Sequence, residues 1–197
     1  HATNGLLKVL TGDLAGARAL MEHEFQVEGV DIVPRKAIVY RQVLGAVALL
    51  SGDDEQAVDV LTAALDMARA EGIREPGRRQ RLEGDLGQAL VNTDRLAEAN
   101  ELAVELKTLG ERGGRPTILG VGKRIEGLVC AARGDLNGAV SALTTAVAAH
   151  RKSQLPLEYG RSVLAYGQVL RRRKAKGEAR TALKAALECF TTLGAER

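Results

Sequence analysis

Apolar residues in this chain recur at helical spacing and nowhere alternate with polar residues as they do in a strand. Near the end of the chain, Val163, Tyr166 and Leu170 fall on one face of a predicted helix. Leu183 and Leu187 then share one face of the following helix. The pattern therefore predicts an all-α protein built from amphipathic helices.

A repeat of about 40 residues orders these helices. Five similar segments end in evenly spaced alanines, namely Ala17, Ala57, Ala99, Ala139 and Ala179. A glycine stands at the same distance before each alanine, at Gly5, Gly45, Gly87, Gly127 and Gly167. All four prolines stand at a second fixed distance before the glycines of repeats two to five, at Pro34, Pro76, Pro116 and Pro156. Such regular spacing predicts stacked αα-hairpins, each with a helix A and a helix B.

The in-phase residues predict where the helices begin and end. Each proline suits the first turn of helix A, where its missing N–H has no helical partner. The glycines expected to end helix A are Gly12, Gly52 and Gly134, and the aspartates expected to cap helix B are Asp13, Asp53 and Asp135. The glycines expected at the end of helix B are Gly72, Gly113 and Gly194. The helix A glycine is predicted to meet the small recurring alanine of helix B.

The fixed spacing of glycine and alanine, followed by apolar residues such as Leu61 and Leu143, resembles the tetratricopeptide repeat. That family has a period of about 34 residues, so this chain would be a longer and divergent variant. The resemblance implies a right-handed superhelical solenoid forming one domain over residues 1–197. The expected repeats cover approximately 1–32 (with helix A truncated), 33–74, 75–114, 115–154 and 155–197.

Composition narrows the possible functions. The net charge of +3 is too small to indicate direct contact with nucleic acid, and no apolar run reaches the ~18 residues of a membrane span. Cys130 and Cys189 form neither a metal motif nor a disulfide framework; they are expected in the core, with redox sensing as the alternative. These features favour a cytoplasmic protein. Because the chain starts at His1 without a methionine, we expect a fragment of something larger.

No motif indicates an enzyme. The segment from Gly120 to Lys123 is superficially similar to a phosphate-binding loop, but Thr117 and Arg124 replace the residues that the motif requires. The histidines His1, His23 and His150 lack metal-ligand spacing, and no serine or cysteine has an evident base. The basic run Arg171–Lys176 fits a solvated helix end, with an acidic partner or nucleic acid as the alternative.

The last stretch, from Leu155 to Arg197, resembles the final repeat of large ATP-binding LuxR-type transcriptional regulators, as does Arg133-Gly-Asp-Leu-Asn-Gly-Ala139. In that family a nucleotide-binding module of the STAND type precedes a helical repeat sensor, and a helix-turn-helix follows it. The resemblance implies an effector- or partner-binding region without a cofactor of its own, ATP being bound only by an upstream domain. The alternative is a stand-alone scaffold that binds proteins and has no link to transcription.

In repeats of this type helix A lines a concave groove. Positions 6 and 3 before the helix A glycine, and 1 and 4 after it, are predicted to face inward. The polar residues at these positions are Gln42, Arg81, Gln88, Arg124, Arg161, Gln168 and Arg171. Four arginines without a carboxylate predict a positive groove for an anionic small-molecule effector or an acidic peptide. The alternatives are an empty groove or one filled by the parent protein, and uncapped repeat ends also suggest possible homo-oligomers.

Overall fold

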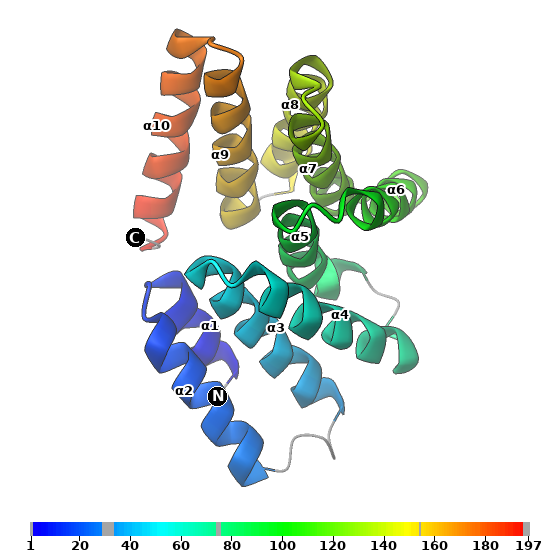
Figure 1. Ribbon diagram of the computed structural model, residues 1–197, viewed down its shortest axis with the longest axis vertical. Coiled ribbons are helices and arrows are strands. Elements are labelled where there is room, and N and C mark those ends of the chain that lie inside the picture. The colour runs from blue at the N-terminus through cyan, green and yellow to red at the C-terminus, as the bar shows by residue number, and fades with distance from the viewer. Residues whose placement is uncertain (1, 29–33, 74–75, 154, 195–197) are drawn as a thin grey trace. The chain divides into compact units, whose positions relative to one another are not determined.

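The computed structural model describes residues 2–28, 34–73, 76–153 and 155–194. Within these residues the chain forms ten α-helices that follow one another as hairpins (Figure 1). The helices are α1 (Ala2–Leu10), α2 (Leu14–Glu28), α3 (Pro34–Ser51), α4 (Asp54–Ala70), α5 (Pro76–Asn92), α6 (Leu96–Arg112), α7 (Pro116–Ala132), α8 (Leu136–Lys152), α9 (Pro156–Arg172) and α10 (Lys176–Thr192). The all-α prediction is confirmed. No helix in the described part of the chain is both long and apolar enough to cross a membrane.

The predicted helix ends are confirmed in most repeats. Helices α3, α5, α7 and α9 all begin at the in-phase prolines. Asp135 accepts a hydrogen bond from the backbone N–H of Gly138 at 2.9 Å, and Asp53 caps α4 in the same way through Gln56 at 3.3 Å. Gly134 precedes this cap with a φ of 85°, in the left-handed region that favours glycine. Local chemistry therefore sets the turn between helix A and helix B.

In two repeats the turn after helix A lacks this glycine. Asp94 and Lys174 occupy the position of Gly134 in their repeats and adopt φ angles of 59° and 65°. Aspartate tolerates this conformation better than lysine does, because its short side chain can bond locally. Helix α6 ends at Arg112, so Gly113 lies directly after helix B as predicted. The left-handed residue there is the next one, Gly114, with a φ of 58°.

The glycine of helix A lies against a leucine of helix B, and not against the recurring alanine as predicted. A Cβ on Gly127 would lie 2.6 Å from Cγ of Leu143, and one on Gly45 would lie 2.4 Å from Cγ of Leu61. The leucine stands four residues after the recurring alanine, and long helical side chains lean back over the preceding turn. The glycine therefore makes room for a fully buried leucine.

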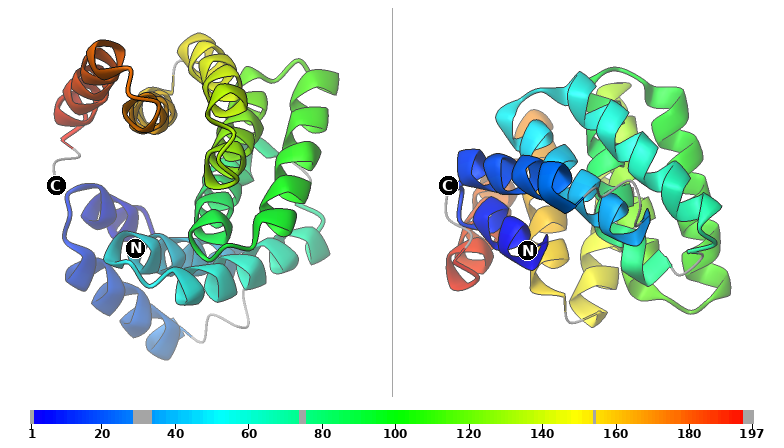
Figure 2. Two further views of the ribbon diagram at one scale, coloured as in Figure 1. Left: turned by 45° about the horizontal axis from the view of Figure 1, so that its top comes forward. Right: turned by 90° about the horizontal axis from the view of Figure 1, so that it is seen from below.

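The chain divides into two compact units. The first contains α1 to α5 and ends at Thr93, and the second spans Asp94–Gly194 with α6 to α10. In the second unit α7 packs against α6 and α8, and α9 packs against α8 and α10. Figure 2 shows α9 and α10 lying side by side as one hairpin. The division falls between the two helices of the third predicted repeat.

Candidate ligand-binding face of the second unit

The predicted groove residues of the first unit are engaged with neighbours on their own helix or are half-buried. Arg81 places Nε 3.7 Å from the buried carboxylate of Asp85, and its side chain is 14% exposed. Gln88 donates a hydrogen bond from Nε2 to Oδ1 of Asn92 at 2.8 Å. Gln42 is half-buried. Their role in ligand binding stays a prediction.

In the second unit, Arg124 and Arg161 share one carboxylate. Nη1 of Arg124 lies 2.7 Å from Oε2 of Glu158, and Nη1 of Arg161 lies 3.4 Å from Oε1 of the same residue. Arg124 and Glu158 are each only 4% exposed. The predicted inward positions carry no carboxylate themselves, but Glu158 reaches two of their arginines from the first turn of α9 and offsets their charge. Its spacing of three residues before Arg161 was the signal available in the sequence.

The charges around Glu158 determine its protonation. Burial alone would raise the pKa of its carboxyl group, but the positive charges of Arg124 and Arg161 and the hydrogen bond from Arg124 outweigh burial. Together they lower the pKa of Glu158 to about 2. Glu158 is therefore ionised at neutral pH and holds Arg124 in a buried pair between α7 and α9. This arrangement joins α7 to α9 and leaves Arg124 inaccessible to a ligand.

A buried histidine of α8 contacts both α7 and α9. His150 is 0% exposed, with Nδ1 2.8 Å from Oγ of Ser162 and Nε2 3.2 Å from the carbonyl oxygen of Thr117. Nε2 must donate to the carbonyl, so Nδ1 accepts from the hydroxyl of Ser162. The ring lies against Gly120, where a Cβ would come within 2.5 Å of Nε2. Gly120, which begins the segment superficially similar to a phosphate-binding loop, thus lies inside α7 and makes room for His150.

His150 makes stability depend on pH. Burial lowers the pKa of His150 to about 4, and the charge of Arg124 adds to this effect. As pH falls through 6.5, the histidine of the unfolded chain takes up a proton before the folded one does. The contribution of His150 to the free energy of unfolding is therefore fully present above pH 6.5 and is lost towards about pH 4. We expect a loss of about 2 kcal/mol between about pH 7 and pH 5. Urea unfolding of wild type and His150→Asn tests this, and an equal loss in the variant would contradict it.

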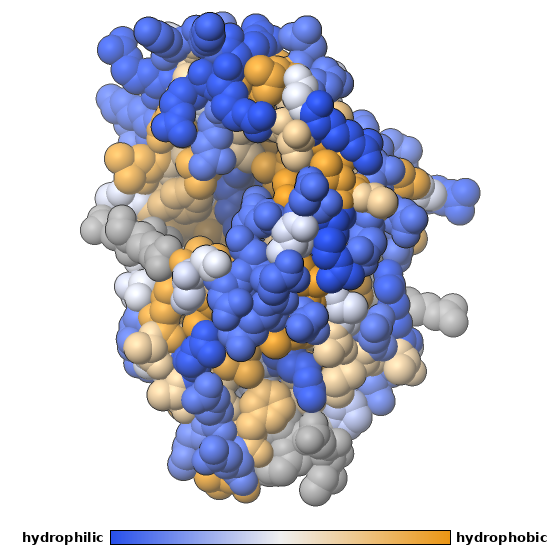
Figure 3. Space-filling view, viewed as in Figure 1, coloured by the Kyte–Doolittle hydropathy of each residue, from blue (hydrophilic) through white to orange (hydrophobic). Residues whose placement is uncertain are grey.

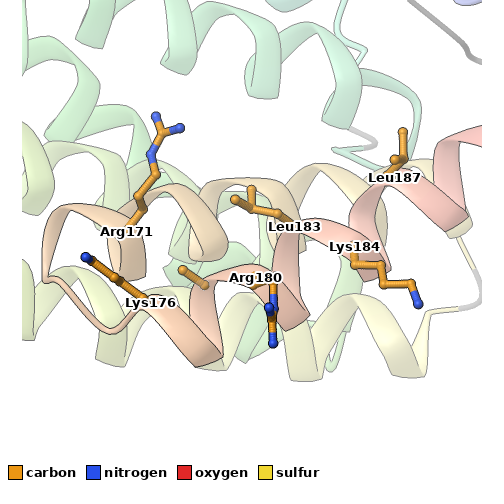
Figure 4. Close-up of a pocket in the computed structure, with 7 residues that line it drawn as sticks. Arg171, Lys176, Arg180, Leu183, Lys184 and Leu187 are labelled. Atoms are coloured by element: carbon orange, nitrogen blue, oxygen red, sulfur yellow. The ribbon is translucent and has the colours of Figure 1, made fainter.

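The remaining two predicted groove residues, Gln168 and Arg171, are exposed near the end of α9. Arg171 lines an open hollow of about 680 Å³ between α9 and α10, shown in Figure 4. The other lining residues all belong to α10, namely Lys176, Ala179, Arg180, Leu183, Lys184 and Leu187. In Figure 4 Arg171, Leu183 and Leu187 project to the same side of the helices. Of the predicted groove residues, Arg171 alone lines this hollow.

The hollow combines apolar surface with positive charge. Leu187 is 65% exposed, which is high for a leucine. Lys184 places Nζ 3.7 Å from the carboxylate of Glu188. No carboxylate among the described residues lies within ion-pair distance of Arg171, Lys176 or Arg180. Figure 3 shows hydrophilic residues gathered over the loop between α9 and α10, with hydrophobic surface further along the hairpin.

The environment of the two thiols does not favour reactivity. Both cysteines are free and half-buried, and burial raises the pKa of each. Cys189 donates a hydrogen bond from Sγ to the carbonyl oxygen of Pro156 at 3.1 Å, and Cys130 packs against the core formed by α7, α8 and α9. In the described ranges no three His, Cys, Asp or Glu side chains lie close enough to hold a metal ion.

Comparisons with known proteins identify the fold. No protein-family model and no curated protein matches the chain by sequence. Among solved structures, a Rap protein complexed with Competence and Sporulation Factor matches with a TM-score of 0.76 over 97% of this chain, at 15% identity. This chain spans 55% of that protein's length. BtubC from P. vanneervenii matches with a TM-score of 0.55 over 100% of this chain and 86% of its own, at 14% identity. The chain therefore has a tetratricopeptide-like fold of sequential helical hairpins.

Proposed function

We propose that this chain is a protein- or peptide-binding repeat domain, and that its second unit binds an acidic peptide segment in the hollow between α9 and α10. The observation that carries the proposal is one hollow that combines an exposed leucine and a half-buried leucine with three basic side chains that pair with no carboxylate of the described residues. Arginine suits this role because its planar guanidinium binds carboxylates through two parallel hydrogen bonds. The Rap protein of similar fold was crystallised with a bound factor, which supports partner binding as a use of this fold.

The hollow fits a peptide better than a small anion. An ion pair between exposed groups contributes no more than about 1 kcal/mol, so a small anion held only by Arg171 and Lys176 would bind weakly. Burying an exposed leucine side chain contributes about 2 kcal/mol, a contact that Leu187 offers to a partner, and the half-buried Leu183 adds a smaller apolar area. A peptide with both carboxylates and apolar side chains uses both kinds of contact. The groove ligand predicted from the sequence is accordingly narrowed to an acidic, partly apolar segment.

Reversing the charge of Arg171 should weaken binding of such a peptide. We expect Arg171→Glu to raise the Kd of a fluorescent peptide rich in Glu and Leu by about tenfold, measured by fluorescence anisotropy. Affinity should also fall with added salt, because the charges are exposed. Arg133→Glu is the matched control, since Arg133 is exposed on the second unit but lies outside the hollow. Equal weakening by both variants, or binding of a peptide with Lys in place of Glu, would contradict the proposal.

The role in a larger protein is a further part of the proposal. The resemblance of residues 155–197 to LuxR-type regulators supports a sensor region whose ligand shifts a multidomain regulator between two states. The alternative remains a stand-alone scaffold. The full-length gene distinguishes them: a Walker motif upstream and a helix-turn-helix after Arg197 support the regulator, and their absence supports the scaffold.

A further inference from the structure

The outer face of α10 differs from the equivalent face of α8, on which the next hairpin packs. Leu136, Val140 and Val147 of α8 contact the cores that include Val163 and Val169 of α9. The repeat relates each residue of α8 to one of α10, with the same spacing that separates Ala139 from Ala179. The equivalents of the three docking residues are therefore Lys176, Arg180 and Leu187.

The two cations in place of apolar residues change which kind of helix can pack on α10. A helix with an apolar face like that of α9 would bury the charges of Lys176 and Arg180 without partners, and unpaired buried charges are strongly unfavourable. The end of helix A adds a third cation, because Arg171 stands where repeat four has the buried Ala131. A further hairpin of the same kind is therefore disfavoured on this face. A helix with carboxylates opposite the cations and an apolar residue opposite Leu187 would fit.

The spacing on α10 matches one stripe of a helix. Lys176, Arg180, Leu183 and Leu187 stand at i, i+4, i+7 and i+11, which places them along one face over about 16 Å. All four line the hollow, and Figure 4 shows Leu183 and Leu187 on the same side. A partner helix lying along this stripe would meet cations at one end and leucines at the other.

We propose that this stripe binds an acidic amphipathic helix of a partner protein, which packs along α10 in the position that α9 takes on α8. The inference rests on the proposed function, because it concerns the same hollow and adds the conformation of the bound segment. The partner helix carries carboxylates opposite Lys176 and Arg180, and its apolar residues cover Leu183 and Leu187.

The experiment compares two fluorescent peptides of about 18 residues, long enough for an isolated helix. One carries Leu and Glu at helical spacing, and the other has the same composition with a central proline that breaks the helix. We expect the helical peptide to bind about tenfold more tightly and to gain helical circular dichroism when bound. Arg180→Glu and Leu187→Ala should each weaken its binding about tenfold, whereas Arg133→Glu should leave it unchanged.

The outcomes separate this inference from the proposed function. If both peptides bind equally and Arg180→Glu weakens both, the hollow binds acidic peptides but the proposal that the partner is helical is overturned. If neither peptide binds, the inference and the proposed function both fail. If the helical peptide binds and Arg180→Glu leaves its affinity unchanged, the inference is overturned, and Arg171→Glu still tests the proposed function. If native mass spectrometry shows a dimer that Arg180→Glu dissociates, the stripe binds a second copy of this chain and the acidic partner helix is overturned.

Discussion

Replacing Arg124 with alanine is expected to lower the free energy of unfolding by about 4 kcal/mol, since it leaves a buried carboxylate without its main partner. The side chains of Arg124 and Glu158 are each 5% exposed and approach to 2.7 Å, joining α7 to α9. Arg161, at 3.4 Å and 24% exposed, compensates only part of the loss. Urea unfolding followed by circular dichroism at neutral pH measures the change.

Two controls identify burial as the cause. Arg95→Ala removes an exposed pair of the same length, 2.7 Å to Glu98, and should cost below about 1 kcal/mol. The double variant Arg124→Met with Glu158→Leu removes both buried charges and should recover most of the stability lost by Arg124→Ala. A loss from Arg124→Ala no larger than that from Arg95→Ala would show that this pair is not buried as described.

The Arg124–Glu158 pair makes a second acid-sensitive contribution to stability, in addition to that of His150. Because the folded pKa of Glu158 is lowered to about 2 from 4.5, its contribution to stability is present above pH 4.5. The contribution is then lost as pH falls towards 2. His150 acts earlier, between pH 6.5 and about 4. The two groups together predict that the second unit loses stability progressively on acidification.

The turns of this fold were predictable because their causes are local. A glycine with positive φ, an aspartate that caps the next helix and a proline in the first turn each act within a few residues. Gly134, Asp135 and Pro156 accordingly lie where their chemistry requires. The turn at Lys174 was not predictable from local chemistry, since it has the same conformation without the glycine. There the flanking helices impose the backbone geometry.

The site was predicted less well because its causes are not local. Counting from the helix A glycine assumed that the same positions face inward, into the groove, in every repeat. Arg124 is instead buried, because Glu158 of the following repeat approaches it across the interface between α7 and α9. Arg171 was correctly predicted to be exposed, yet the hollow also depends on α10 side chains such as Arg180 and Leu187. No spacing within one helix indicates which residues of the next helix complete a surface.

Replacing Gly110 with valine is expected to destabilise the protein by about 3 kcal/mol, since it forces α6 and α7 apart. A Cβ on Gly110 would lie 2.5 Å from the backbone nitrogen of Leu119 and 2.8 Å from its Cα. Across the same contact, a Cβ on Gly122 would lie 2.9 Å from the backbone nitrogen of Lys107. Backbone atoms on both sides cannot move aside as a flexible side chain does, so the helices themselves must shift.

Substitutions at two other glycines serve as controls for this prediction. At Gly127 the obstacle to a Cβ is the side chain of Leu143, so Gly127→Ala should cost less than Gly110→Val. At Gly177, within α10, nothing lies within 4 Å of an added Cβ, and alanine should stabilise the helix by about 0.5 kcal/mol. Thermal unfolding of the three variants should therefore give Tm values that decrease in the order Gly177→Ala, Gly127→Ala, Gly110→Val. A Gly110→Val variant as stable as wild type would mean that α6 and α7 do not approach through their backbones.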